Sequence, residues 1–369
     1  MVDNKQRIQT IIKAIGIIFA VFLSIAIIYL AYVFLSYSRI EDNQRLAVNS
    51  PKQQLSDLDS GQMAIDKTYT VGTYNVGFGA YLPDYSFFMD GGKYSRCYSG
   101  ESGADAIKGA AGLSLKYEPD FMMFQEVDRD STRSYHVNQE NLITEIFNNY
   151  YETFAVNYDS AYLFYPFNEP IGASYSGIAS YSKYKITDSL RRSLPISTGF
   201  SKFLDLDRCY AINRIKVENG KELVLINVHL SAYGNSDEIR EGQLKMLFGD
   251  IKKEIEKGNY IICGGDFNHD LKADEKDSEN CESWAFPFPR SKMPSGVRFA
   301  MDELDKETME KMPESNRNND TEYIPGKTYV CTLDGFIISD NVELKGYQIV
   351  DTGYAYSDHQ PVFMNFKLK

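Results

Sequence analysis

The stretch Tyr-Ile-Ile-Cys-Gly-Gly-Asp-Phe-Asn at residues 260–268 decides how this chain folds. An apolar run of strand length ends in two glycines, and the carboxylate of Asp266 and the carboxamide of Asn268 follow it closely. An ionised carboxylate at the end of a buried strand costs several kcal/mol if it has no partner. Such a residue is tolerated where it binds a metal or joins a hydrogen-bonded network. The stretch therefore predicts a buried strand with a functional site at its end.

The same pattern recurs at other apolar runs of strand length along the chain. Together with Asp266 and Asn268, the polar residues at these runs are Asn75, Glu126, His229, Asp334, Asp358 and His359. Two of the chain's four histidines fall at such positions. This recurrence predicts one convergent site, and oxygen ligands without a thiolate favour Mg²⁺ or Mn²⁺ over zinc. A hard cation among carboxylates neutralises a phosphate and holds it for in-line attack by water.

Each motif taken alone has a plainer explanation, because Gly-Asp-Phe-Asn at 265–268 also fits a turn and Ser-Asp-His at 357–359 is weakly specific. The order of the whole set is more specific. In chain order the segments are Thr73-Tyr74-Asn75, Gln125-Glu126, Asn227-Val228-His229-Leu230, Gly265-Asp266-Phe267-Asn268, Leu333-Asp334-Gly335-Phe336 and Ser357-Asp358-His359-Gln360-Pro361-Val362. This ordered set resembles the endonuclease/exonuclease/phosphatase superfamily from about residue 68 to the C-terminus.

The coarse pattern of elements agrees with this resemblance. Strand candidates outnumber helix candidates, and many neighbouring strands are joined by short turns. Helical spacing occurs at residues 101–117, 137–150 and 236–257, the last with Ser236 as its N-cap. Such alternation favours two packed sheets flanked by helices. The resemblance implies an α/β (α+β) fold, namely a four-layer sandwich of two packed mixed β-sheets flanked by helices.

The resemblance also implies a role for each residue of the set. Glu126 would be the main ligand of Mg²⁺ or Mn²⁺, with Asn75 beside it and Asp358 sharing the ion. Asp266 would orient or deprotonate the attacking water. Asn268 would hold a phosphate oxygen or the nucleophile.

The two histidines of the set would act on the phosphate. His359, oriented by Asp334, would hydrogen-bond the phosphoryl oxygen and stabilise the transition state. His229 would contact the phosphate or assist the leaving group. Arg133 and Arg208 are further candidates, because a guanidinium binds a phosphate through two parallel hydrogen bonds. A salt bridge or a surface position is the alternative explanation for either arginine.

Residues 14–35 form 22 consecutive positions without a charge. A bilayer core of about 30 Å needs roughly 20 such residues in a helix, and Tyr29, Tyr32 and Tyr37 fit one membrane interface. We expect an uncleaved transmembrane helix after a short tail of residues 1–13. A buried core helix and a signal peptide are the alternatives. Basic residues before the span slightly outnumber those after it, which favours a single-pass protein with its catalytic domain outside the cytoplasm.

The rest of the chain divides into a linker and one domain. Residues 36–67 are polar with few aromatic side chains, which is typical of a linker, and residues 68–369 form the catalytic domain. Residues 270–328 break the strand pattern and predict an insertion on the rim of the active site. Its Trp284 packs the insertion on the domain or faces substrate or lipid.

The five cysteines include no CxxC pair, which argues against a zinc ribbon. Cys263 is expected to be buried, and one disulfide among the other cysteines is an open alternative.

The net charge of −12 bears on the substrate. Proteins that bind nucleic acid without sequence preference draw most of their affinity from basic residues on phosphates. The negative charge and the membrane helix therefore favour a phospholipid or a small organic phosphate over a nucleic acid. We expect a metal-dependent hydrolase of a phosphodiester or phosphomonoester. A nuclease and a catalytically inactive binding module are the alternatives, and no protein partner is predicted.

Overall fold

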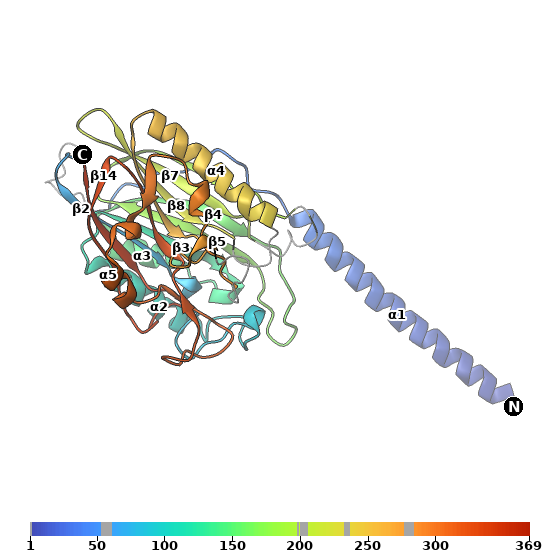
Figure 1. Cartoon of the computed structure of the whole chain (residues 1–369). Helices are drawn as coiled ribbons and strands as arrows, with labels where there is room; N and C mark the ends of the chain where they lie inside the picture. Colours follow the sequence, from blue (N-terminus) through green and yellow to red (C-terminus); the bar gives the residue numbers. More distant parts are fainter. Residues whose placement is uncertain (1, 53–60, 198, 200–205, 232–236, 277–283) are drawn as a thin grey trace.

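Two mixed β-sheets lie face to face at the centre of the domain (Figure 1). The computed structural model describes residues 2–52, 61–197, 199, 206–231, 237–276 and 284–369. The larger sheet runs in the order β1 (Gln44–Arg45), β6 (Ile186–Ser193), β7 (Cys209–Lys216), β8 (Glu222–His229), β9 (Tyr260–Asp266), β13 (Asp334–Ser339) and β10 (Val297–Phe299). The smaller sheet runs in the order β14 (Val342–Ile349), β15 (Val362–Leu368), β2 (Thr68–Asn75), β3 (Phe121–Ser131), β5 (Ser174–Ser182) and β4 (Tyr151–Asp159). β8 is parallel to β9 and β2 is parallel to β3, while the other neighbours are antiparallel.

Side chains alternate between the two faces of each strand, as the period of an extended chain requires. On β8, Leu223 and Leu225 pack in the core between the sheets, whereas Val224 and Ile226 pack under a helix on the outer face. All four are fully buried, and each such side chain contributes roughly 1.5–3 kcal/mol by leaving water. Both faces of this strand are therefore covered, which makes its sequence almost continuously apolar.

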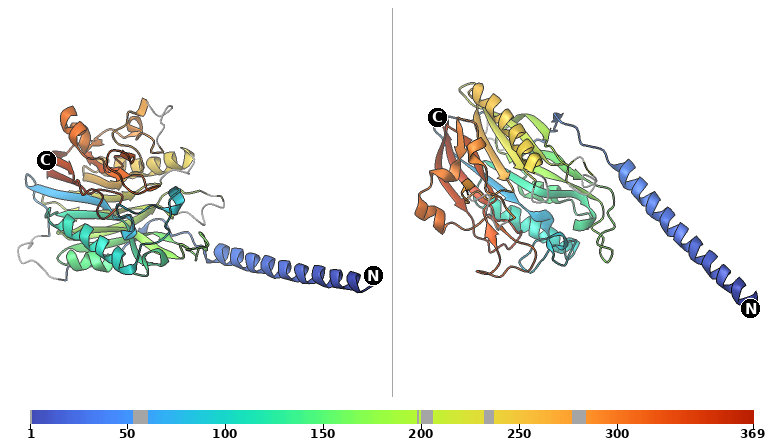
Figure 2. Two further views of the ribbon diagram at one scale, coloured as in Figure 1. Left: turned by 90° about the horizontal axis from the view of Figure 1, so that it is seen from below. Right: turned by 45° about the vertical axis from the view of Figure 1, so that its right-hand side comes forward.

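Helices cover the outer faces of both sheets. Helix α4 (Asp237–Glu256) packs on the larger sheet, and helices α2 (Gly100–Leu115) and α3 (Gln139–Ile146) pack on the smaller one. The side chain of Ser99 caps α2 and that of Asn138 caps α3, so each helix begins where a side-chain oxygen accepts a backbone N–H. Ser236, expected to cap α4, lies outside the described residues. The order helix, sheet, sheet, helix confirms the predicted four-layer sandwich (Figure 2).

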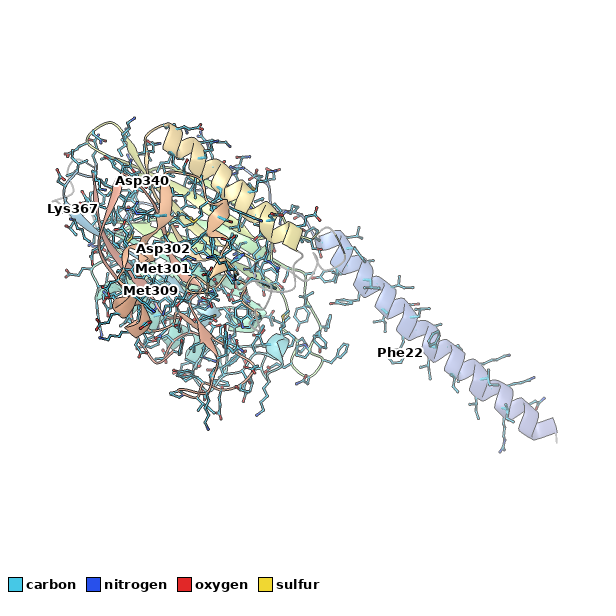
Figure 3. The ribbon with its side chains drawn as sticks, in the orientation of Figure 1. Phe22, Met301, Asp302, Met309, Asp340 and Lys367 are labelled. Carbon is cyan, nitrogen blue, oxygen red and sulfur yellow. The ribbon has the colours of Figure 1, made fainter. Side chains whose placement is uncertain are left out.

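The N-terminal helix α1 (Val2–Ser36) projects from the domain (Figures 1 and 2). Residues 6–36 contain an 18-residue window with a mean hydropathy of 2.8, and the helix is long and apolar enough to cross a membrane. Most of its large apolar side chains, Phe22 among them, are exposed (Figure 3), whereas Val33 near its end is buried. A membrane anchor and a signal sequence both have this composition. The exposed surface excludes the alternative of a buried core helix.

The segment that follows α1 is packed on the domain in its described parts. Strand β1 pairs with β6, and the backbone of Asn49 exchanges hydrogen bonds with that of Glu152 in β4. Met63 is fully buried and bridges to Val217. Residues 53–60 lie outside the described part. The boundaries of the linker stay a prediction. Residues 37–52 and 61–67 pack on the domain rather than forming an extended connection to the helix.

The residues of the predicted rim insertion form short elements. They are β10, helix α5 (Lys306–Lys311), whose N-cap is the side chain of Asp305, and β11 (Asn316–Arg317), which pairs with β12 (Val330–Cys331) just after the insertion.

Cys97, Cys209, Cys263 and Cys331 are buried free thiols. Cys281 lies outside the described residues, so none of the described cysteines pairs with another.

Candidate active site

Strand register places three of the predicted residues side by side at one end of the larger sheet. His229 ends β8, Asp266 ends β9 and Asp334 begins β13. Asp266 is the direct partner of His229 across the parallel pair and of Asp334 across the antiparallel pair. Residues 37 and 68 positions apart in the sequence therefore become direct neighbours because their strands pair.

The smaller sheet supplies the other half of the set. Asn75 ends β2, Glu126 lies in β3, and His359 comes shortly before β15. The Asn75 amide nitrogen lies 3.3 Å from Glu126 Oε1, 3.1 Å from Asp266 Oδ2 and 3.4 Å from His359 Nε2. Asn75 thus links residues of both sheets, and the two halves of the site meet at this amide.

Unusual backbone conformations aim two of these side chains. Glu126 has φ = 56° at a β-bulge, and Asn268 has φ = 50° just after β9. Positive φ is uncommon for residues other than glycine, and bulges beside active sites redirect side chains. Gly265 has φ = 144°, and a Cβ there would lie 2.0 Å from the carbonyl oxygen of Val228. Glycine is therefore required immediately before Asp266.

His359 is held as a cation by its carboxylate neighbours. Its Nδ1 lies 2.7 Å from Asp334 Oδ2, and both side chains are buried. Burial opposes a charge on the ring, but the carboxylates of Asp334, Asp358 and Asp266 outweigh it and raise the pKa of His359 well above its usual value. The ring therefore carries a proton at neutral pH and is a charged hydrogen-bond donor.

His229 is held neutral in the same site. Burial lowers the pKa of His229 well below its usual value, and the positive charge of Arg208 lowers it further. Arg208 Nη1 lies 2.6 Å from His229 Nε2. Because a guanidinium can only donate, this contact makes Nε2 the unprotonated acceptor and leaves the ring proton on Nδ1.

Asp266 lies between the two histidines. Its Oδ2 is 3.5 Å from His229 Nε2 and 3.8 Å from His359 Nε2. Burial raises the pKa of Asp266 to about 7; the charge on His359 opposes this rise and that on Asp334 adds to it. Its Oδ1 accepts the backbone N–H of Asn268 at 2.8 Å. A fixed carboxyl group with a pKa near neutrality is suited to take a proton from water.

One pocket of about 550 Å³ joins these residues. Of the predicted site residues, those that line it are Glu126, Arg133, Arg208, His229, Asp266, Asn268, Asp358 and His359. The remaining two, Asn75 and Asp334, are buried and contact lining residues through the hydrogen bonds given above. The structure therefore brings every predicted site residue to one place.

The model of the Endonuclease/Exonuclease/phosphatase family matches residues 72–359, which include all of these residues. This chain belongs to that family. It is accordingly a metal-dependent hydrolase that acts on phosphoester bonds. No curated protein sequence matches the chain significantly.

Solved structures of family members share the fold at low sequence identity. Danio rerio TDP2 complexed with single-strand DNA product is 18% identical, with a TM-score of 0.54 over 82% of this chain and 100% of that one. An endonuclease/exonuclease/phosphatase from Beutenbergia cavernae is 15% identical, with a TM-score of 0.54 over 82% and 72%. The human Nocturnin catalytic domain with bound sulfate is 16% identical, with a TM-score of 0.51 over 82% and 94%. These likenesses establish the sandwich fold of this family member.

The family typically uses a divalent metal, and the donor set of this pocket fits one. Glu126 and Asp358 line the pocket together with Asp90. Burial raises the pKa of Asp90 to about 7, and the charges of Asp358, Asp320 and Glu126 add to this rise. Acidic groups that disfavour one another's charge are stabilised by a cation among them. Glu126 and Asp358 are oxygen donors of the kind that Mg²⁺ and Mn²⁺ prefer, whereas the Asn75 oxygen accepts the backbone N–H of Gly77 at 3.0 Å and its amide nitrogen faces Glu126.

A second group of ligand atoms needs no ion to explain it. One ligand atom each from Asp266, Asp334 and His359 lie within 4.8 Å of one another. However, the close pair in this group is the hydrogen bond between Asp334 and His359. We therefore attribute this group to the network that charges His359.

The two candidate arginines lie in the pocket but differ in their partners. Arg133 donates to both oxygens of the buried Asp128, at 2.8 and 3.1 Å, and its guanidinium lies 4.0 Å from the ring centre of Phe78. Its paired donors are thus occupied within the protein. Arg208 contacts His229, and its Nε has no hydrogen-bond partner among the described residues. Arg208 is therefore the better placed of the two for a phosphate.

The rim segment supplies site residues that motif reasoning did not find. Asn316 Nδ2 lies 3.0 Å from His359 Nε2, and Asn319 Nδ2 donates to Asp358 Oδ2. Arg317 is buried with its guanidinium on the carbonyls of Tyr81 and Leu82. The sequence signal was a short polar run, residues 314–320, that carries no known motif. Only the pairing of β11 with the chain at His359 reveals its place.

Proposed function

We propose that this protein is a membrane-anchored Mg²⁺- or Mn²⁺-dependent phosphoesterase that hydrolyses a phospholipid headgroup or a small organic phosphate. The convergence of Glu126, Asp266 and His359 in one pocket carries the catalytic part of this proposal. The exposed apolar surface of α1 supports the anchor. The slight excess of basic residues before the span supports a catalytic domain outside the cytoplasm.

The side chains of the pocket divide the reaction among them. Asp266, with its near-neutral pKa and its fixed position, orients the attacking water and accepts its proton. The charged His359 donates a hydrogen bond to a phosphoryl oxygen as negative charge develops there. Asn268 holds the nucleophile or a second phosphate oxygen. Glu126 and Asp358, with Asn75 beside them, would hold a divalent cation, which would neutralise charge on the phosphate.

The leaving-group side of the pocket contains His229 and Arg208. Neutral His229, with its proton on Nδ1, contacts the phosphate or assists departure of the leaving group. Arg208 places a positive charge beside it, and within the described part of the chain no salt bridge joins Arg208 to a carboxylate. Together with Arg133 at the pocket wall, this charge favours an anionic substrate.

The acidic character of the chain supports a small phosphate or a lipid rather than a long nucleic acid. One observation favours the alternative of a nuclease, because the similar TDP2 structure is complexed with single-strand DNA product. A binding module without activity is a further alternative, and the complete set of site residues opposes it.

A substrate panel tests the proposal. The full chain in lipid nanodiscs is incubated with Mg²⁺ and, separately, with a phospholipid, a small phosphomonoester or phosphodiester, and single-strand DNA; EDTA and Asp266→Ala serve as matched controls. We expect turnover of a lipid or small phosphate that both controls abolish. Turnover of DNA alone would establish the nuclease, and no turnover of any ester would favour the binding module.

A further inference from the structure

A loop with exposed aromatic side chains lies between β4 and β5. This aromatic loop, residues 160–171, exposes Phe164 at 50%, Tyr165 at 63% and Phe167 at 86% of their surface. Large apolar side chains gathered in this way mark an interaction surface rather than ordinary surface composition. The loop has a single charged residue, Glu169, whose carboxylate is engaged by Ser95.

The base of the aromatic loop is fixed in the domain. Leu163 and Ile171 are buried in the cluster that contains Phe78 and Tyr85. The backbone of Leu163 pairs with that of Gly172, which closes the loop at its base. The exposed tip is therefore presented from a rigid support, and its position relative to the rest of the domain is determined.

The loop also contacts α1. The Tyr29 hydroxyl donates to the carbonyl oxygen of Tyr162 at 3.2 Å, and the Tyr32 hydroxyl accepts the N–H of Tyr162 at 3.2 Å. The rings of Tyr29 and Phe164 meet edge to face, with centroids 5.3 Å apart. The loop therefore lies beside the last turns of this helix.

The position of these contacts along α1 sets the depth of the loop. At 1.5 Å per residue, Tyr29 lies about 9 Å inside the end of the uncharged stretch at Leu35. The uncharged stretch is about 33 Å long, so in a bilayer core about 30 Å thick its end extends about 2 Å past the core and Tyr29 lies about 7 Å below the core surface, within the roughly 5–10 Å to which interfacial segments insert. Tyrosine and other aromatic side chains are enriched in that layer.

We propose that the aromatic loop inserts into the surface of the same bilayer that α1 spans. This inference rests on the proposed anchoring role of α1. The occupant is the interfacial layer of a lipid membrane, and the near absence of charge on the loop makes the contact hydrophobic rather than dependent on anionic lipids.

This docking brings the mouth of the active-site pocket to the membrane. Ile171 at the base of the loop lines the pocket, and so do Phe87 and Met89. Phe88, next to both, packs against Tyr165 with ring centroids 5.8 Å apart. Met89 is 62% exposed beside the loop. A phosphate ester at the lipid surface then reaches Arg208 and His359 without leaving the membrane.

The test measures membrane contact independently of catalysis. The full chain is placed in phosphatidylcholine nanodiscs with and without brominated acyl chains, which quench nearby tryptophan. Three variants are compared with the parent chain, whose tryptophan is Trp284: Phe167→Trp, Met89→Trp and Lys306→Trp. Phe167 and Lys306 are largely exposed, so tryptophan is accommodated at both. Lys306 begins α5 on the side of the domain away from α1 (Figures 1 and 2).

We expect bromolipid to lower the added fluorescence of Phe167→Trp about twofold, that of Met89→Trp by less, and that of Lys306→Trp not at all. Equal quenching of all three, or none at Phe167→Trp in nanodisc-bound protein, would overturn the docking. Unquenched Met89→Trp would overturn the placement of the pocket mouth. A chain that fails to enter nanodiscs would refute the anchor and the docking with it. Loss of phosphoesterase activity has no bearing on these readings.

Discussion

His359 and His229 line the same pocket from opposite sheets, and their surroundings hold them in opposite protonation states. His359 has Asp334 at 2.7 Å and carboxylates around it, which raise its pKa. His229 has Arg208 at 2.6 Å, and burial with this neighbouring charge lowers its pKa. Both rings are buried, so burial does not distinguish them. The partner of each ring decides whether it acts as a charged donor or as a neutral base.

The difference also explains how one small site offers both kinds of group. Asp266 lies between the rings, within 4 Å of an Nε2 atom of each. When Asp266 takes a proton from water, it therefore has the protonated ring of His359 on one side and the neutral ring of His229 on the other. Removing the partner of either ring should therefore shift the pKa of that ring in a predictable direction and change its protonation state.

Asp334→Asn should have the largest effect on turnover. The variant removes the charge that holds His359 protonated while it keeps the shape of the side chain. We expect kcat to fall about a hundred- to a thousandfold, the range for losing a preorganised charged donor. The measurement is steady-state hydrolysis of the best ester of the substrate panel. Asp340→Asn, at the exposed far end of the same sheet region, is the control and should leave kcat unchanged. Near-normal turnover of Asp334→Asn would mean that His359 does not act as a cation.

Arg208→Met should have a smaller effect that depends on pH. Removing this cation lets the pKa of His229 rise, although burial still holds it below its usual value. We expect kcat/KM to fall roughly tenfold near pH 5 and little near pH 8, because only about one tenth of the rings stay neutral when the pH lies one unit below the pKa. The pH profile from 5 to 8 is the measurement. Arg208→Lys keeps the charge and should keep the wild-type profile shape. A loss that is equal at every pH would assign Arg208 to phosphate binding alone.

The buried neutral state of His229 should also appear in stability. Below about pH 6.5 the unfolded chain binds a proton at this ring that the folded state excludes, so stability falls as pH falls. Between pH 6.5 and 5.5 the expected loss is about 1 kcal/mol. Urea unfolding of wild type and His229→Gln, both in EDTA, measures it. The variant should lose correspondingly less over this interval, and identical losses would show that His229 is protonated in the fold.

The sequence predicted the fold, and the residues it proposed for the site lie together around one pocket, but it did not point to the rim-segment residues such as Asn316. Apolar runs of strand length located the strands, and a polar residue at the end of such a run is costly unless it has a purpose. Strand register then brings these residues together, because Asp266 is the direct cross-strand partner of both His229 and Asp334. The pairing of Asp334 with His359 followed from the family resemblance. The contact between Arg208 and His229 followed from neither, because it depends on how two side chains turn after folding.

The sequence was least informative where contacts are long-range and carry no pattern. Arg133 was a candidate for binding phosphate, but two of its guanidinium nitrogens donate to the carboxylate of Asp128, five residues earlier in the sequence. Residues 37–52 lack an apolar pattern, yet β1 adds to the edge of a sheet through backbone groups that any sequence carries. The rim segment likewise reaches His359 through a short backbone bridge at Asn316.

Asn316→Ala should give the smallest effect of the series and tests whether the rim segment belongs to the site. Asn316 Nδ2 lies 3.0 Å from His359 Nε2, on the side of the ring that faces the phosphate. It touches neither Asp334 nor the carboxylates that set the charge, so the ring keeps its proton. A protonated ring can only donate, so this hydrogen bond requires the Asn316 amide to turn its oxygen toward Nε2. Losing this hydrogen bond, worth about 1 kcal/mol, predicts a fall in kcat of roughly fivefold with an unchanged pH profile. Asn219→Ala, at an exposed turn position that does not line the pocket, is the control. A pH profile that shifts in Asn316→Ala would mean that this amide, and not Asp334 alone, sets the charge on His359.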